Sequence, residues 1–294
     1  MISYDYYRIF YYVAQYHSFT KAAEILENNQ PNITRCMNNL EHDLNCKLFI
    51  RSNRGVTLTP EGQTLYEHVA VACQQFQIGE EKLQQNQSLE NGLVSIGASE
   101  TALRLMLLDK LQAFHERYPK VRLRISNHST PQAVAALERG LVDFAVVTTP
   151  VTIKKPLHKI PLYSFHEILI GGLKYADLGR SVLHLNELKA IPMISLGNDT
   201  STRELYLQYY SSHNLPFHPD MEAATTDQIL PMVEHNLGIG FYPEKLAAES
   251  LTQGKIIQIH LDEPLPERQV CLIHSTARPQ SIAVKTLQRV LAET

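Results

Sequence analysis

The 294-residue sequence has no long apolar run and no basic leader. No stretch approaches the roughly 20 apolar residues that a membrane-spanning helix needs. The first ten residues, MISYDYYRIF, contain neither the basic region nor the apolar core of a signal peptide. We therefore expect a cytoplasmic protein that neither enters a membrane nor is secreted.

Cysteine is also scarce, and its spacing is uninformative. The four residues Cys36, Cys46, Cys73 and Cys271 form no CxxC pair and have no histidines at zinc-site spacing. Scattered, unpaired cysteines suit a reducing compartment. The sequence therefore predicts neither a disulfide framework nor a metal site.

Motifs for catalysis and cofactor binding are missing as well. The segment GASET does not satisfy GxSxG, the thirteen histidines include no HExxH, and no GxxxxGK[ST] loop occurs. We therefore expect that the protein is not an enzyme and that it needs no cofactor.

Charge of one sign is not concentrated anywhere near the N-terminus. The net charge is −3, and residues 1–65 contain six basic and six acidic side chains. A nucleic-acid site in this region would depend on how the charges are arranged, because no general excess of positive charge is present.

Residues 5–45 have the periodicity of three short helices. Apolar residues recur at helical spacing in each of them. The first stripe is Tyr6, Ile9, Phe10 and Val13, the second is Phe19, Ala22, Ala23 and Leu26, and the third is Ile33, Met37, Leu40 and Leu44. Ser18 and Asn29 precede the second and third stripes and are typical N-cap residues.

The third of these helices has an unusual polar face. Pro31 suits its first turn, where a missing N–H needs no partner. Arg35 and Asn38 lie opposite the apolar stripe. Amides and arginine can read base edges in the major groove, which admits an α-helix. A solvated helix face with no partner is the alternative interpretation.

A hairpin and a long helix follow. Leu48–Ile50 and Val56–Leu58 read as two strands around a turn, and Thr59 caps a helix that runs to about Gln87. Its apolar seam consists of Leu65, Val69, Ala72, Cys73, Phe76 and Leu83. A helix of about 42 Å is too long for a small domain to bury, so we expect a partner helix. A charge at Val69 should then yield monomers.

The remaining residues alternate between strand and helix patterns. Six short β-type runs are LVSIGA, VRLRIS, VDFAVV, EILIGG, IPMIS and GIGFY, and helical stretches lie between them. Such alternation predicts an α/β fold with mainly parallel strands. About 200 residues are many for one sheet, so we expect two lobes with a cleft.

Polar residues gather where these strands end and helices begin. The residues in question are Ser99, Glu100, Thr101, Thr130, Thr148, Asn198, Thr200, Thr202 and Thr225. Helix N-termini with free N–H groups favour anions, and open α/β sheets bind ligands at strand ends. Simple helix capping would use the same residue types, and this alternative stays open. Because acidic residues are present too, we expect a small metabolite with a carboxylate and an amino group.

Three helices followed by a glycine-tipped hairpin form the pattern of a winged helix-turn-helix. On this interpretation the recognition helix contacts bases, and basic residues around it contact phosphates. The base-contacting candidates are Gln30, Asn32, Thr34, Arg35 and Asn38, and the phosphate-contacting candidates are Lys21, Arg51 and Arg54.

Residues 6–65 resemble the N-terminal domain of LysR-type transcriptional regulators. The matching runs are FYYVAQYHSFTKAAEIL and NQPNITRCMNNLEHDLNCKLFIRSNRGVTLTPEG. LERGLVDFAVV and MVEHNLGIGFYPEKLA resemble segments of the family's two lobes. By position, the helix-turn-helix spans Ser18 to Met37. Gln30, Pro31, Thr34 and Arg35 match the recognition helix and Arg54 matches the wing.

The resemblance implies an α/β protein with three parts. These are a winged helix-turn-helix at 1–59, a dimerising linker helix at 60–90 and a two-lobed effector domain at 91–294 that resembles periplasmic solute-binding proteins. The first lobe would comprise 91–161 and 267–294, and the second 162–266. The implied partners are double-stranded operator DNA, a small-molecule effector, RNA polymerase and further copies of the chain in a homodimer or homotetramer. A solute-binding transport protein is the rival interpretation of the two lobes.

Overall fold

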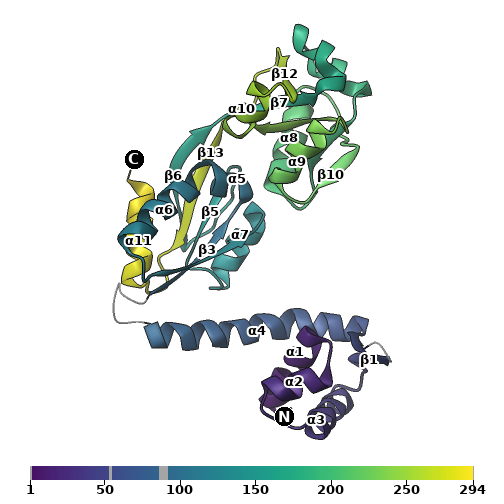
Figure 1. Cartoon of the computed structure of the whole chain (residues 1–294), viewed down its shortest axis with the longest axis vertical. Coiled ribbons are helices and arrows are strands. Elements are labelled where there is room, and N and C mark those ends of the chain that lie inside the picture. Colours follow the sequence, from purple (N-terminus) through teal and green to yellow (C-terminus); the bar gives the residue numbers. More distant parts are fainter. Residues whose placement is uncertain (1, 53–54, 86–91, 294) are drawn as a thin grey trace. The chain divides into compact units, whose positions relative to one another are not determined.

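The computed structural model describes residues 2–52, 55–85 and 92–293. Its contacts divide the chain into two compact units, Met1–Gln84 and Gln85–Thr294. Figure 1 labels the helices and strands of both units. Each unit has its own core. The predicted division at residues 59 and 90 stays a prediction, and the long helix α4 (Pro60–Gln85) clusters with the first unit.

The first unit consists of three short helices, a hairpin and α4. The helices are α1 (Tyr4–Tyr16), α2 (Phe19–Ile25) and α3 (Gln30–Asp43), and the strands are β1 (Phe49–Ser52) and β2 (Gly55–Leu58). The predicted N-caps are confirmed. Ser18 Oγ accepts the Lys21 N–H, Asn29 Oδ1 accepts the Asn32 N–H, and Thr59 Oγ1 accepts the Gly62 N–H.

The core of this unit lies where the three predicted stripes meet. Phe10, Ile33, Met37 and Leu40 are fully buried in it. Helix α4 approaches the hairpin so closely that a Cβ atom at Gly62 would lie 2.2 Å from the Leu48 carbonyl oxygen. The hairpin and α4 therefore pack together with no room for a side chain at this position.

The apolar seam of α4 is divided between two environments. Val69 is buried, and Leu65 and Cys73 pack against the same core. By contrast, Ala72 and Phe76 are exposed, whereas the side chain of Leu83 lies outside the described residues. The expectation that a charge at Val69 would act on a partner helix is therefore wrong, because Val69 belongs to its own domain's core. In the described part of α4, the Phe76 side stays exposed and is open to a partner helix.

The second unit contains two lobes, each built on one sheet. Lobe 1 has the strand order β4-β3-β5-β13-β6, with β3 (Leu93–Ala98), β4 (Arg122–Asn127), β5 (Phe144–Thr148), β6 (Leu157–Phe165) and β13 (Arg268–Ser275). Alternate residues of β5 and β13 face opposite sides. One side packs against α7 (Thr130–Glu138), and the other packs against η1 (Leu103–Leu107), α6 (Leu108–Arg117) and α11 (Ile282–Ala292).

Lobe 2 has the strand order β10-β9-β11-β7-β12-β8. Its strands are β7 (Glu167–Gly172), β8 (Val182–Leu183), β9 (Met193–Leu196), β10 (Met221–Ala223), β11 (Ile239–Pro243) and β12 (Ile256–Leu261). Helix α8 (Ser201–Ser212) covers one face, together with η2 (Leu173–Arg180) and η3 (Leu185–Ala190). Helices α9 (Thr226–Glu234) and α10 (Glu244–Thr252) cover the other.

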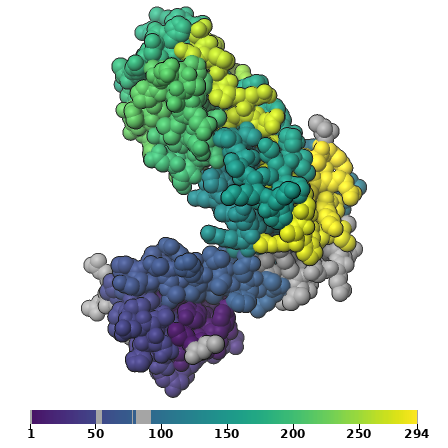
Figure 2. Space-filling model, turned by 180° about the vertical axis from the view of Figure 1, so that it is seen from behind, coloured from purple at the N-terminus to yellow at the C-terminus, as the bar shows by residue number. Residues whose placement is uncertain are grey.

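The chain crosses between the lobes twice, from β6 to β7 and from β12 to β13. In Figure 2 the yellow C-terminal residues lie against the teal residues of lobe 1, although the whole of lobe 2 separates them in sequence. Strand β13 runs antiparallel to β5 and β6, and β7 runs antiparallel to β11 and β12. The other pairs in these two sheets are parallel, so β13 and β7 are each the one reversed strand of their described sheet and the expectation of mainly parallel strands is confirmed.

Among the described residues, no helix combines the length and the apolar character needed to cross a bilayer. Nor does any group of three or more metal-ligating side chains occur in the described part of the chain.

Candidate nucleic-acid interface and interlobe cleft

Helix α3 presents one apolar face and one polar face, as its sequence predicts. Ile33, Met37 and Leu40 are fully buried. The opposite face is exposed at Gln30, Pro31, Arg35 and Asn38, whereas Asn32 and Thr34 are half-buried. Cys36 is buried at the edge of the apolar face. The exposed face can therefore enter a groove without disturbing the core.

A chain of amides orients the arginine of α3. Asn32 Nδ2 donates to Asn28 Oδ1 at 3.0 Å, and Arg35 Nη2 donates to Asn32 Oδ1 at 2.9 Å. Asn39 Nδ2 donates to the Tyr6 hydroxyl of α1 at 3.2 Å. Fixing Arg35 in this way lowers the conformational entropy that it would lose on binding a partner.

The three candidate phosphate contacts differ in what the structure shows. Lys21 is exposed, and its Nζ lies 2.9 Å from Glu24 Oε2, so its charge is already paired at the surface. Arg51 belongs to β1, but its side chain is not described. Arg54 lies outside the described residues.

Glu41 is a structural carboxylate of this unit that motif reading did not single out. Its Oε1 accepts the N–H groups of Leu48 and Phe49 at 2.9 and 3.3 Å, and its Oε2 lies 2.6 Å from Lys47 Nζ. Burial alone would raise the pKa of Glu41, but the hydrogen bonds from Lys47 and the two backbone groups outweigh it and lower the pKa. Glu41 therefore ties α3 to the first strand of the wing.

This lowered pKa makes a prediction about acid stability. A carboxyl whose pKa is lower in the folded protein stabilises the fold above its unfolded pKa, here near 4.5, and this contribution is lost as the pH falls through the folded value. We expect Glu41→Gln to destabilise the first unit at neutral pH and to lose that effect progressively below about pH 4.5. Urea unfolding followed across this range is the measurement. Glu24→Gln, at an exposed site, is the control and should show no such convergence.

The two lobes enclose a cleft that is rich in hydroxyl groups. It contains about 410 Å³ of empty space, part of which is open to solvent. The lining residues are Ser99, Glu100, Thr101, Asn127, His128, Ser129, Thr130, Thr148, Leu196, Thr200, Ser201, Thr202, Ala224, Thr225 and Thr226.

Of the nine residues proposed from sequence for this cleft, eight line it and Asn198 does not. Asn198 is exposed in the turn that precedes α8, where the Thr200 N–H bonds back to the Gly197 carbonyl. Placing Asn198 in the cleft was therefore wrong, because this turn leaves its side chain in solvent. The sequence analysis did not include Asn127, His128 or Ser129, which also line the cleft.

Some of the lining hydroxyls also cap helices, so the capping interpretation holds for these residues. Thr200 Oγ1 accepts the Arg203 N–H at 3.2 Å, and Ser99 Oγ accepts the Ala102 N–H at 3.4 Å. Thr101 instead donates to Thr226 Oγ1 in the opposite lobe at 3.1 Å. The capping residues hold the helix N-termini at the cleft, where the exposed N–H groups favour an anionic group.

Two titratable residues shape the charge of the cleft. Burial raises the pKa of Glu100, and the neighbouring Asp227 raises it further. Glu100 Oε2 also accepts a hydrogen bond from Asn127 Nδ2 at 3.0 Å. Burial lowers the pKa of His128 and so favours its neutral form. The lining contains no lysine or arginine among the described residues, so hydroxyl and amide groups are its main hydrogen-bond donors.

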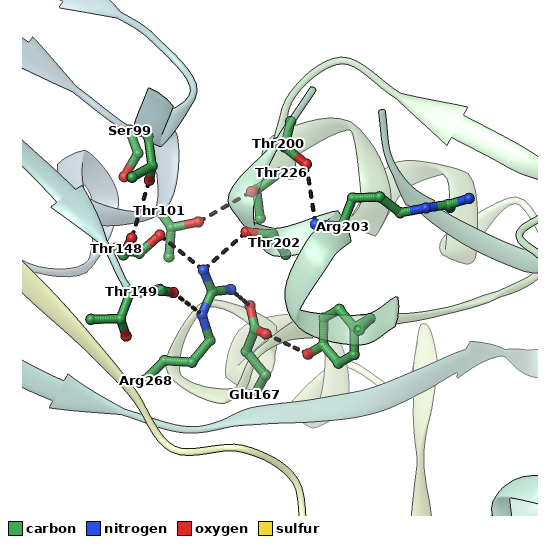
Figure 3. A network of polar contacts seen from close by, with 12 residues as sticks. Ser99, Thr101, Thr148, Thr149, Glu167, Thr200, Thr202, Arg203, Thr226 and Arg268 are labelled. Carbon is green, nitrogen blue, oxygen red and sulfur yellow. Dashed lines mark hydrogen bonds and ion pairs between the residues drawn. The ribbon is translucent and has the colours of Figure 1, made fainter. Parts of the chain in front are cut away.

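Beneath the cleft lies a buried ion pair that the sequence did not predict (Figure 3). Arg268 is 1% exposed at the start of β13, and Glu167 is buried at the start of β7. Arg268 Nη1 lies 2.7 Å from Glu167 Oε1, and Arg268 Nε donates to the Thr149 carbonyl at 2.9 Å. Burial raises the pKa of the Tyr206 phenol well above its ordinary value, and this phenol donates to Glu167 Oε2.

Comparison with known proteins agrees with this architecture. The family described as "Bacterial regulatory helix-turn-helix protein, lysR family" matches residues 4–63, and "LysR substrate binding domain" matches residues 87–294. The chain therefore belongs to the LysR family of DNA-binding transcriptional regulators. It combines a helix-turn-helix with a two-lobed α/β domain, as the sequence predicted.

Individual relatives agree with the family assignment. The chain is 26% identical over 287 residues to a probable RuBisCO transcriptional regulator of Guillardia theta, covering 95% of this chain and 92% of the relative. It is 27% identical over 269 residues to the regulator YofA of Bacillus velezensis, covering 92% and 90%. The crystal structure of CbnR, a LysR family regulator, superposes with a TM-score of 0.73 at 16% identity, covering 99% and 100%. These relatives are transcriptional regulators, and none of these matches indicates an enzyme family.

Proposed function

We propose that a small-molecule effector bound in the interlobe cleft controls how this regulator acts on its operator DNA. The observation that carries the proposal is the cleft itself, since both lobes contribute hydroxyl groups and helix N-termini to it. A ligand that contacts both lobes favours one arrangement of them over others, and can thereby shift the protein between states.

The proposed effector is a small carboxylate, with an amino group placed near Glu100. Helix N-termini and hydroxyls suit the carboxylate, and a carboxyl group on the wall can pair with an ammonium group. An interlobe cleft could equally serve a transport protein, but the helix-turn-helix unit and the family assignment favour regulation.

The direct test adds fractionated metabolite extract to the full-length protein and follows its binding to promoter DNA by fluorescence anisotropy. We expect one fraction to change the affinity, and Thr225→Trp, which fills the cleft, to abolish that change. Thr252→Trp adds the same side chain at an exposed site of α10 and should respond like wild type. If Thr225→Trp responds to the fraction as wild type does, the effector binds outside the interlobe cleft.

The exposed face of α3 is proposed to read bases through Arg35. If Arg35 bonds a guanine edge, Arg35→Ala should reduce discrimination between operator and random DNA by about 1–3 kcal/mol. Competition gel shifts at a fixed salt concentration measure this difference. Equal losses on operator and random DNA would show that Arg35 contacts only the backbone.

The exposed side of α4 is proposed to form the dimer contact. Phe76 is 54% exposed and meets Tyr4 edge-on at 5.1 Å, which leaves a large apolar surface uncovered within one chain. We expect Phe76→Glu to give monomers in light scattering, because a charge in an apolar interface loses its hydration. Gln74→Glu adds the same charge at another exposed position of α4 and should leave the oligomer intact.

Three further properties of the protein stay predictions. These are assembly as a homodimer or homotetramer, a contact with RNA polymerase and a cytoplasmic location.

A further inference from the structure

Arg268 is the point where the two lobes and the cleft meet. Its Nη2 donates to Thr148 Oγ1 and to Thr202 Oγ1, each at 2.9 Å (Figure 3). Thr148 ends β5 in lobe 1, and Thr202 lies in the first turn of α8 in lobe 2. One guanidinium group therefore binds a hydroxyl from each lobe, and both hydroxyls belong to residues that line the cleft.

These two contacts restrict where the hydroxyl hydrogens can point. An arginine N–H can only donate, so each threonine oxygen must accept at this contact. Each hydroxyl keeps one hydrogen of its own, and neither of these hydroxyls donates to another group in the described residues. Their hydrogens are therefore available to a partner in the cleft.

The geometry also fixes how far apart the two hydroxyls can be. Because both oxygens lie 2.9 Å from the same nitrogen, they cannot be separated by more than 5.8 Å, which is twice that distance. A carboxylate placed between them can accept one hydrogen bond from each, at the usual O–H···O distance of about 2.7 Å. Each oxygen also keeps a second lone pair, but only a group that accepts can satisfy both free hydrogens at once.

Four acceptors hold the guanidinium itself in place. Besides the two threonines, Arg268 donates to the Thr149 carbonyl of lobe 1 and to the Glu167 carboxylate of lobe 2. Its guanidinium carbon also lies 5.4 Å from the centre of the Phe165 ring. Such a fork of donors needs arginine, since a lysine ammonium cannot reach all four acceptors in one plane.

We propose that Arg268 is a positioning residue that creates a carboxylate-binding point from one hydroxyl of each lobe. Arg268 brings Thr148 and Thr202 together and occupies one lone pair of each, which leaves their hydrogens to donate to a bound carboxylate that bridges the lobes. This inference rests on the proposed function, and it adds the residues that bind the carboxylate and the residue that positions them.

The test uses the full-length protein and a defined set of probes. Pyruvate, succinate, L-glutamate and benzoate are each compared with their methyl esters, and inorganic phosphate serves as the other oxyanion. The rise in melting temperature with probe concentration gives the apparent affinity. We expect at least one carboxylate to bind more tightly than its ester. If phosphate alone binds, or if every ester binds as well as its acid, the carboxylate assignment is overturned.

Substitutions then assign the preference to these residues. Thr148→Val and Thr202→Val keep the side-chain shape and remove the hydroxyl, and each should weaken carboxylate binding by about tenfold. Both should also lose the preference for acid over ester, which a merely structural role would not change. Thr148→Ser and Thr202→Ser keep the hydroxyl and should bind within about threefold of wild type. Wild-type affinity and preference in both valine variants would overturn the proposal.

Arg268→Lys tests the positioning role. It keeps a positive charge beside Glu167 but loses the fork, so we expect the acid-over-ester preference to fall although the protein still melts cooperatively. Arg278→Lys is the matched control, because the bonds of Arg278 within the described residues go to the Leu137 and Glu138 carbonyls of lobe 1. If Arg268→Lys does not fold, the valine variants still decide the question. Failure of the proposed function would appear separately, as DNA binding that no metabolite fraction changes.

Discussion

Replacing Glu167 with alanine is expected to lower the free energy of unfolding of the second unit by about 3–5 kcal/mol. The side chains of Arg268 and Glu167 are 2% and 3% exposed, so the variant would leave a buried guanidinium without its counter-charge. The loss includes the bond from the Tyr206 phenol, whose hydroxyl would also lose its acceptor. Urea unfolding of the full-length protein, followed by a probe in this unit, measures the change.

An exposed pair of the same chemistry provides the control. Arg180 and Asp177 lie 3.0 Å apart, and their side chains are 79% and 85% exposed. Water screens this pair, so Asp177→Ala should cost only about 0–1 kcal/mol. Replacing both Glu167 and Arg268 with methionine should recover more than half of the lost stability, because no uncompensated charge remains buried. An effect of Glu167→Ala as small as that of Asp177→Ala would show that the buried pair contributes little.

Replacing Phe10 with alanine is expected to remove about 3–5 kcal/mol from the stability of the first unit. Phe10 is fully buried, and its ring lies 5.3 Å from that of Phe49 on the wing. A loss of this size approaches the whole stability of a small domain, which is about 5–15 kcal/mol. We therefore expect Phe10→Ala to lose operator binding at growth temperature.

The matched control is Ile50→Ala on the same strand as Phe49. Ile50 is 54% exposed, so its truncation should change stability by no more than about 0.5 kcal/mol. Circular dichroism melting and gel shifts of both variants test the contrast. Retained DNA binding by Phe10→Ala at growth temperature would contradict the role of this core in holding α3.

The sequence predicted those features that depend on neighbouring residues. The stripes of α1, α2 and α3 follow from helical periodicity, and the caps at Ser18 and Asn29 follow from side-chain chemistry within one turn. The clusters of polar residues that follow β3 and β9 could be recognised because their members are adjacent in the sequence. Family resemblance then supplied the order of the domains.

The features that the sequence did not predict depend on distant residues. Glu167 and Arg268 are 101 positions apart, and no local pattern relates them. The same applies to β13, whose neighbours β5 and β6 precede lobe 2. Glu41 could not be recognised for a different reason. It lies among polar residues on α3, and no local pattern shows that its side chain will bond to the wing. Each of these three features is set by tertiary contacts between different elements of the fold.

The two crossings between the lobes also set an order of events during synthesis. Lobe 2 forms from one continuous segment, β7 to β12, whereas lobe 1 needs β13 to fill the gap between β5 and β6. As the chain leaves the ribosome, the lobe that begins first is therefore completed last. Until β13 arrives, β5 and β6 each present an unpaired edge, which is the kind of surface that nascent chains must protect from aggregation.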